Sequence, residues 1–280
     1  MEIIFDKVTY KENISTALEK TFLKNASFKL EGNKVFAILG DSKSGINKIP
    51  NLINATAKPL MGKVKIGEFL NDGRYIKNVN KLRMNIGIVP SNPSDMLFNN
   101  TVKEELNFGL KYFKYKLNKQ EIRIMEALKL VGLTEDYLNK KISSLTISEK
   151  KKISIASALI FNPSVIIFEE PTNYLKYREM EELKRLIKLL KNKYNKMIII
   201  ISKNTDFAYE VSDEVYIINK GAASKYGNAK LLTEEEILNE NNLEAPNIVK
   251  FINTSNKMGG NLTYTNNILD LIKEVYRNVH

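Results

Sequence analysis

The chain has 280 residues, with 43 lysine and arginine residues against 32 acidic residues, one histidine, no cysteine and no tryptophan. This length predicts one large α/β domain with an appendage, and 43% hydrophobic residues exclude bulk disorder. The lack of cysteine excludes disulfides, thiolate nucleophiles and cysteine-bound zinc. The single histidine is His280, the last residue, so chemistry that needs a placed imidazole is not expected.

Residues 1–6 show no basic segment followed by a long apolar core, so we expect no signal peptide. The longest aliphatic runs, 165–168 and 197–201, fall far short of the roughly 20 residues of a membrane span and predict buried parallel strands. The formal charge of +11 would suit an anionic partner, but the basic residues are scattered. No basic stripe with interleaved aromatic residues appears, so nucleic acid is not predicted as a partner.

The hydrophobic pattern predicts an alternation of strands and helices. In chain order, strands are expected at 3–10, 26–30, 35–39, 63–67 and 86–89, helical segments at 101–133 and 148–161, a strand at 165–169, an amphipathic helix around 180–190, a strand at 197–201, a helix at 206–211 and a strand at 214–218. Residues 231–236 resemble a capped helix start, and a separate Asn-rich helical tail follows from about 241. This alternation predicts a mostly parallel sheet with helices on both faces.

Three segments carry a resemblance to a known family. The glycine-bounded loop at 40–47 follows a strand, and the runs 143–146 and 165–172 come after it in the order and spacing of an ABC transporter ATPase subunit. More narrowly, the chain resembles the ATP-binding subunits of energy-coupling factor (ECF) importers. The segments that carry this narrower resemblance are 86–109, 130–133, 243–246 and a helix after residue 267.

The resemblance implies a fold, a cofactor and partners. The fold is α/β, a P-loop NTPase-type ABC nucleotide-binding domain at 1–240, with a helical subdomain at about 95–160 and a small helical C-terminal dimerisation extension at 241–280. The cofactors would be ATP and Mg²⁺. The partners would be a second ABC ATPase subunit, in a homo- or heterodimer, and a transmembrane scaffold subunit, which places the chain at the cytoplasmic face of the cell membrane.

The P-loop of this family reads G-x-x-x-x-G-K-[ST], in which the lysine reaches the phosphates and the hydroxyl holds Mg²⁺. The corresponding run is Gly40, Asp41, Ser42, Lys43, Ser44, Gly45, Ile46, Asn47 and Lys48. Both outer glycines are present, but Ile46 stands at the lysine position and Asn47, a weak metal ligand, at the hydroxyl position. Lys43 stands where the family has an inner glycine. The sequence therefore predicts a degenerate P-loop.

Two lysines and a proline bear on whether this loop could still bind phosphate. Lys43 could replace the missing lysine because it lies in the loop, whereas Lys48 lies two positions off the required helix face. An ordinary surface role is the favoured interpretation of both. Pro50 would interrupt a helix that began at Gly45, so we expect a later start, with Asn47 as the cap.

The Walker B strand ends in Glu169 and Glu170, followed by Pro171 and Thr172 as in the family. The resemblance implies that Glu169, in place of the usual aspartate, organises Mg²⁺, and that Glu170 is the catalytic glutamate. Two acids could also simply end a buried strand, but the residues after them favour the functional interpretation. For the aromatic side chain that stacks on adenine, Tyr10 is a candidate, although Glu12 occupies an equally suitable position.

Other family positions are substituted. Ser91 stands at the Q-loop glutamine, Lys203 at the switch histidine and residues 173–176 at the D-loop. The signature Leu-Ser-Gly-Gly-Gln corresponds to 145–149, where Ile147 would block access to the partner's γ-phosphate and Glu149 would direct a negative charge toward it.

The sequence therefore predicts an ABC subunit of an ECF-type importer for a vitamin or metal ion, degenerate and with weak or no ATP hydrolysis. Whether it is an enzyme stays open. One alternative is a functional ATP-hydrolysing transporter subunit with atypical motifs, using Glu170 and Lys43. Another is a soluble scaffold that acts without a transporter.

Overall fold

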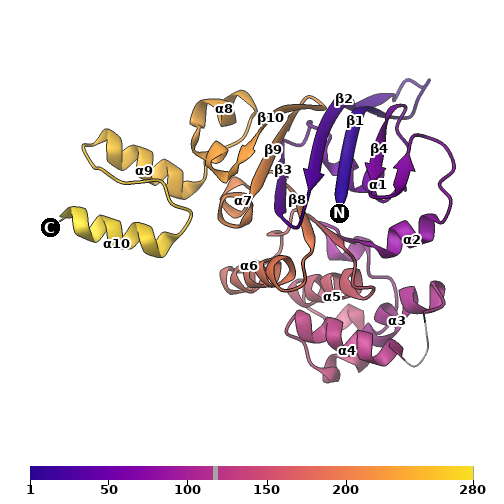
Figure 1. The fold of residues 1–280 in the computed structure, drawn as a ribbon. Helices are drawn as coiled ribbons and strands as arrows, with labels where there is room; N and C mark the ends of the chain where they lie inside the picture. The colour runs from indigo at the N-terminus through magenta and orange to yellow at the C-terminus, as the bar shows by residue number, and fades with distance from the viewer. Residues whose placement is uncertain (116–118, 280) are drawn as a thin grey trace.

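The computed structural model describes residues 1–115 and 119–279, which form two β-sheets with helices around them (Figure 1). The strands are β1 (Glu2–Glu12), β2 (Lys20–Glu31), β3 (Val35–Leu39), β4 (Met61–Ile66), β5 (Phe69–Asn71), β6 (Ile86–Val89), β7 (Val165–Glu169), β8 (Met197–Ser202), β9 (Glu214–Asn219) and β10 (Ala222–Asn228). The helices are α1 (Ile49–Ile53), α2 (Val79–Met84), α3 (Val102–Tyr112), α4 (Gln120–Leu130), α5 (Ile147–Leu159), α6 (Tyr177–Asn192), α7 (Thr205–Val211), α8 (Glu235–Glu240), α9 (Asn247–Lys257) and α10 (Ile268–Val279).

The central sheet has the strand order β10-β9-β3-β8-β7-β6. Its strands run parallel except β10, which pairs antiparallel with β9 at one edge. Strands β3 and β8 are buried along their whole length, as apolar strands covered on both faces should be. The prediction of an α/β fold with a mostly parallel sheet is confirmed. Because parallel strands end at the same edge, the loops after β3, β7 and β8 meet there.

A second sheet is antiparallel, with the order β2-β1-β4-β5. Ile3, Phe5 and Val8 on β1 are buried, and they belong to one apolar cluster that also contains residues of α1 and of the central sheet. The sequence predicted strands in the places of β1, β2 and β4, but neither β5 nor a separate sheet. Alternation shows only that one face of a strand is buried, and it does not show which strand lies beside it.

Helices α3, α4 and α5 pack against one another below the central sheet, and α6 lies beside α5 (Figure 1). Their apolar residues form one continuous cluster with those of β7 and β8. The single helical pattern expected at 101–133 is divided into α3 and α4, and α5 begins at Ile147. The boundary of a helical subdomain at about 95–160 stays a prediction.

The C-terminal region forms a helical unit that projects from the sheets, with α9 and α10 side by side (Figure 1). Buried Ile252, Leu262 and Leu271 hold these two helices together. The helix start expected at 231–236 is present, but the expected cap is not. Residues 229–233 form a 3₁₀-helix, and α8 begins at Glu235 without a side-chain cap. Within the described ranges, no helix has the length and apolarity that crossing a membrane requires.

Candidate functional site

The loop after β3, residues 40–48, is a compact turn held by its own bonds. The backbone N–H of Lys43 donates to Asp41 Oδ1 (2.9 Å), and the Ser44 hydroxyl donates to the Asp41 carbonyl (2.6 Å). Gly45 has φ +82°, and a Cβ there would overlap the Phe22 carbonyl oxygen. The backbone N–H groups of Lys43 and Ser44 are thus used within the loop, and the retained glycine has a steric role.

Ile46 and Asn47 begin a 3₁₀-helix, Ile46–Lys48, and α1 starts only at Ile49 with Pro50 in its first turn. The expectation of a late helix start is confirmed, but the cap expected at Asn47 is wrong, because Lys48 occupies the N-cap position. Ile46 is 6% exposed and packs in the apolar cluster beneath the second sheet. The side chain at the P-loop lysine position therefore points into the core, and its hydrophobicity explains why.

The Lys48 side chain turns toward the end of β1. Its Nζ lies 2.6 Å from Glu12 Oε1 and 4.5 Å from the centre of the Phe22 ring. Tyr10 donates its hydroxyl to the same Glu12 oxygen (3.0 Å), and burial together with Glu12 raises the pKa of Tyr10 to about 12. These contacts join both candidate adenine positions, Tyr10 and Glu12, to Lys48. Lys48 is therefore engaged away from the loop, whereas the Lys43 side chain is exposed.

Glu169 and Glu170, which we call the acid pair, end β7 as the sequence predicted. Burial raises the pKa of Glu169 to about 7, with the charge of Lys151 opposing the rise and Asp95 adding to it. Glu170 has φ +39°, and both its carboxylate oxygens accept bonds, Oε2 from the Ser202 hydroxyl (2.6 Å) and Oε1 from the Lys203 backbone N–H (3.0 Å). The Glu170 carboxylate is thus held toward the end of β8.

The Q-loop, D-loop and switch positions also meet at this edge of the sheet. Asn173 Nδ2 donates to the Ser91 hydroxyl (2.8 Å), which connects the segment after β7 with the segment after β6. Asn204 caps α7 by accepting the Phe207 N–H (3.0 Å), and its own N–H donates to the Ser202 hydroxyl (2.9 Å). Two of the substituted side chains, Ser91 and Asn173, therefore contact each other.

The signature position lies at the N-terminus of α5. Thr146 and Glu149 form a capping box, in which Glu149 Oε2 accepts the Thr146 N–H (2.8 Å), and Tyr137 donates to Glu149 Oε1 (2.7 Å). The Glu149 carboxylate turns back to cap its own helix, so its negative charge lies at the N-terminus of α5. Ile147 is 39% exposed at the same end. The N–H groups that could face an anion are thus partly satisfied already.

One buried residue near the acid pair was not singled out from the sequence. Lys151 on α5 is fully buried, and its Nζ donates to the carbonyls of Pro90 (2.7 Å) and Ser91 (3.0 Å). A signal was available, because Ile147, Lys151 and Ile155 recur at the i, i+4 and i+8 positions of one helix face.

The fit of Mg·ATP to this edge can be judged from the side chains present. The family site needs a lysine and a hydroxyl after the second glycine, whereas Ile46 is in the core and Asn47 offers a neutral amide. The acid pair is present, but burial raises the pKa of Glu169 and the Glu170 carboxylate is bonded to the end of β8. These residues do not supply the groups on which the family chemistry depends.

The fold and the order of these positions define an ABC-type nucleotide-binding subunit. The chain belongs to the ABC transporter family, whose model matches residues 23–173. It is 29% identical over 280 residues to the energy-coupling factor transporter ATP-binding protein EcfA3 of Oenococcus oeni, covering 98% of this chain and 96% of the relative. It is 31% identical over 252 residues to EcfA2 of Staphylococcus epidermidis, covering 89% and 88%. Membership of this family implies ATP binding, usually with Mg²⁺.

Solved structures agree with the fold. The structure of cbiO1 from Clostridium perfringens, described as part of the ABC transporter complex cbiONQ, superimposes with a TM-score of 0.72 at 26% identity, covering 90% of this chain and 98% of that one. The ATP-binding cassette MJ0796, in a dimer bound to ADP and Pi, gives a TM-score of 0.73 at 23% identity over 81% of this chain and 98% of that one. The similarity to MJ0796, at 23% identity, supports the fold alone.

Proposed function

We propose that this chain is the ATP-binding-cassette subunit of an ECF-type importer for a vitamin or metal ion, with weak or no ATP hydrolysis of its own. The observation that carries the proposal is the state of the 40–48 loop. Its lysine position is in the core, one of its N–H groups is used by Asp41, and Lys48 is paired with Glu12. We infer the class of importer from the relatives, and we infer the loss of ATP hydrolysis from the substituted loop.

The signature end of α5 supports the same proposal from the other half of the site. ABC dimers join one subunit's P-loop to the other subunit's signature, and here Ile147 is exposed where a glycine would let phosphate approach. Glu149 adds a carboxylate to that helix terminus. This chain would therefore impair both its own site and the site opposite, which favours a supporting role beside an active paralogue.

Purified protein is expected to hydrolyse Mg·ATP no faster than its Glu170→Gln variant, and calorimetry should detect no Mg·ATP binding. Removing one charge-stabilising group typically costs about 10²–10³ in rate, and several such groups are replaced here. A turnover rate normal for a transporter ATPase that Glu170→Gln abolishes would contradict the proposal. Micromolar binding of Mg·ATP without turnover would show that the chain has lost the hydrolysis step but not nucleotide binding.

A functional ATPase with atypical motifs is the second candidate. The observation in its favour is that Lys43 lies in the loop with an exposed side chain, while Glu170 stands at the end of β7. Tight Mg·ATP binding that Lys43→Ala removes would support this candidate. The same calorimetry therefore separates the two functions.

The C-terminal extension supports dimerisation of the chain. On α10, Ile268, Leu269, Ile272 and Tyr276 share one face and are between 44% and 68% exposed, whereas Leu271 on the opposite face packs against α9. An exposed apolar face of this kind is typical of a protein interface. We place a second ABC subunit on it, and the purified chain tests the homodimer.

The Ile272→Glu variant is expected to weaken self-association by about tenfold or more, since burying an isoleucine side chain contributes about 1.5–3 kcal/mol. Sedimentation velocity on the purified chain measures this change. Lys273→Ala, on the same helix but outside the apolar face, is the matched control and should leave the dissociation constant unchanged. A dimer that Ile272→Glu does not affect would exclude this face.

A membrane scaffold subunit is the other proposed partner. Phe98, Phe108 and Tyr112 are 66%, 46% and 65% exposed, and their rings follow one another at 4.7 and 6.4 Å. Phe98 and Phe108 line a cavity of about 300 Å³ between α3 and β6. An aromatic surface beside a groove suits an apolar helix of a partner. This contact would hold the chain at the cytoplasmic face of the cell membrane.

A further inference from the structure

A buried lysine just before β8 has no acidic partner. Lys196 is 8% exposed, and its Nζ donates to the Asn162 carbonyl (3.0 Å). Across residues 1–115 and 119–279, no carboxylate forms an ion pair with this ammonium. Lysine is almost never buried to this extent unless its charge is paired. A neutral carbonyl satisfies one hydrogen bond but does not balance the charge of Lys196.

Lys196 borders a cavity of about 490 Å³ at the C-terminal ends of α4, α5 and α6, which we call the basic cavity. Arg123, Lys129 and Lys193 line it as well. Burial lowers the pKa of Lys196, and the positive charge of Arg123 lowers it further. Positive charge therefore gathers around a lysine whose charged form is already disfavoured, which is an arrangement that a bound anion would stabilise.

The helix ends explain part of this arrangement. Each helix C-terminus carries roughly half a negative charge and attracts lysine, and three helices end at the basic cavity. Glu126, the one acid among the described residues that line it, is paired with Arg123 (3.2 Å). The helix ends therefore offset roughly half of the charge of Lys129, Lys193 and Lys196. An excess of between one and two positive charges is left.

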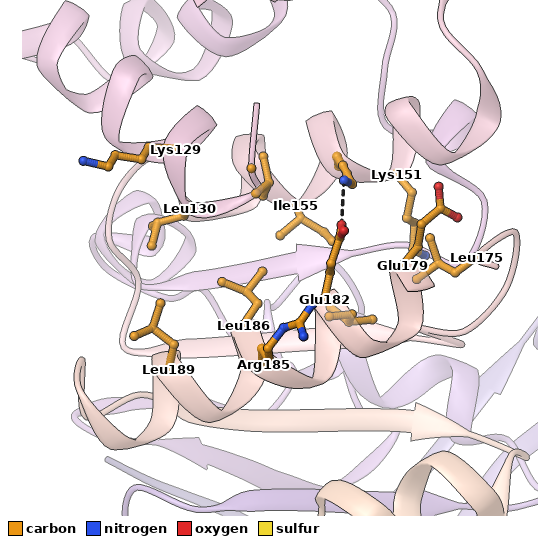
Figure 2. A pocket seen from close by; sticks show the side chains of 14 residues that line it. Lys129, Leu130, Lys151, Ile155, Leu175, Glu179, Glu182, Arg185, Leu186 and Leu189 are labelled. Carbon is orange, nitrogen blue, oxygen red and sulfur yellow. Dashed lines mark hydrogen bonds and ion pairs between the residues drawn. The ribbon is translucent and has the colours of Figure 1, made fainter. Parts of the chain in front are cut away.

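A neighbouring groove of about 480 Å³ between α5 and α6 is arranged differently (Figure 2). Lys129, Leu130 and Leu189 border both the groove and the basic cavity. In the groove, Lys152 of α5 forms an ion pair with Glu182 of α6 (2.9 Å), drawn as the dashed line. The groove thus supplies a carboxylate to its lysine, whereas the described residues of the basic cavity supply none to its buried lysine.

We propose that the basic cavity binds a small phosphate monoester, whose phosphate pairs with Lys196 and whose organic part packs on an apolar wall. Leu130, Leu159, Leu189 and Tyr194 belong to that wall. A phosphate monoester carries about −1.5 to −2 charges near pH 7, which matches the excess. The volume falls within the roughly 300–1,000 Å³ of sites for small organic ligands and exceeds what phosphate alone would fill.

This site is separate from the candidate nucleotide site. Asn162 and Lys196 lie just before β7 and β8, whereas the acid pair ends β7. Because the two strands are parallel, the basic cavity lies at the opposite edge of the central sheet from the 40–48 loop. The proposal therefore goes beyond the proposed function and does not depend on it.

The first test is calorimetry with phenyl phosphate on the full chain, without nucleotide or Mg²⁺. The unchanged protein should bind with a submillimolar dissociation constant, and Lys196→Met should weaken binding by about tenfold or more. Lys191→Met is the matched control, since Lys191 lies near the same end of α6 but is paired with Asp213 (2.6 Å) outside the cavity. No binding by the unchanged protein, or equal losses in the two variants, would overturn the proposal.

A second variant covers the case in which Lys196→Met does not fold. Lys193 is exposed, so Lys193→Glu should fold, and the reversed charge at the rim should weaken phenyl phosphate binding by about fivefold or more. Lys188→Glu, also exposed on α6 but outside the basic cavity, should bind like the unchanged protein. Equal affinities of these two variants would contradict the site.

Two further arms of the calorimetry identify the ligand and its place. Phenyl phosphate should bind about fivefold or more tightly than inorganic phosphate, because its ring packs on the apolar wall. Equal affinities would overturn the proposed ester and leave free phosphate as the ligand. Lys43→Ala, in the 40–48 loop, should not change phenyl phosphate binding. A loss of binding in Lys43→Ala would place the phosphate at the degenerate P-loop and overturn the proposal.

Discussion

The Gly45→Ala variant is expected to lose about 2–5 kcal/mol of unfolding free energy. Gly45 has φ +82°, a left-handed conformation that costs a non-glycine residue about 1–2 kcal/mol. A Cβ at this position would also overlap the Phe22 carbonyl oxygen, and forcing extra atoms into a packed region typically costs a further 1–3 kcal/mol or so. Urea denaturation of the two proteins measures the difference.

Gly132→Ala is the matched control. Gly132 also has positive φ, +71°, but a Cβ there would meet no atom within 4 Å. This variant should therefore show only the backbone strain, about 1 kcal/mol. If both variants lose the same amount, the contact with Phe22 has no role. If Gly45→Ala loses more, the second glycine of the loop is required by the fold, and its retention does not argue for nucleotide binding.

Unfolding free energy is expected to rise with pH between about 8 and 10 in the unchanged protein, relative to Lys151→Met. The pKa of Lys151 falls from 10.5 to about 8 in the folded state, so in this window the unfolded chain binds more protons than the folded one. Deprotonation then removes the cost of a buried charge. A shift of this size corresponds to about 3 kcal/mol by pH 10.5.

Denaturant unfolding at a series of pH values gives the measurement, with Lys152→Met as the control. Lys152 is paired with Glu182 and partly exposed, so its removal should leave the rise intact. The comparison between variants cancels the other groups that titrate in this window. Parallel stability profiles for the unchanged and Lys151→Met proteins would show that Lys151 keeps its ordinary pKa.

Local patterns in the sequence were sufficient for the five parallel strands of the central sheet, though not for β10, and for most of the longer helices. The apolar runs at 165–168 and 197–201 lie in β7 and β8, because a strand covered on both faces needs only hydrophobic residues. The antiparallel second sheet was not predicted, since the pairing of β1 with β4, which lie far apart in the sequence, leaves no local signal. The helix start expected at 231–236 comes at Glu235 without the expected cap, and the apolar residues Leu231 and Leu232 are buried in a 3₁₀-helix before it.

For the candidate site, sequence reasoning identified the positions but not the directions of the side chains. Glu149 could be recognised at the signature position, yet only the fold shows that it caps its own helix and accepts a bond from Tyr137. Asn47 was a reasonable cap by residue type, but the 3₁₀-helix moves the start of α1 to Ile49.

By itself, the sequence determined the family resemblance, the α/β class and the substitutions at Ile46 and Asn47. These follow from the identity of each residue and from the local periodicity of hydrophobic residues, which need no knowledge of the fold. The tertiary structure decided what the substituted side chains contact. The Lys48–Glu12 pair joins residues 36 positions apart, and Lys151 meets a loop 60 positions before it. Such contacts depend on distances across the folded chain, and burial then determines which of these charges must be paired.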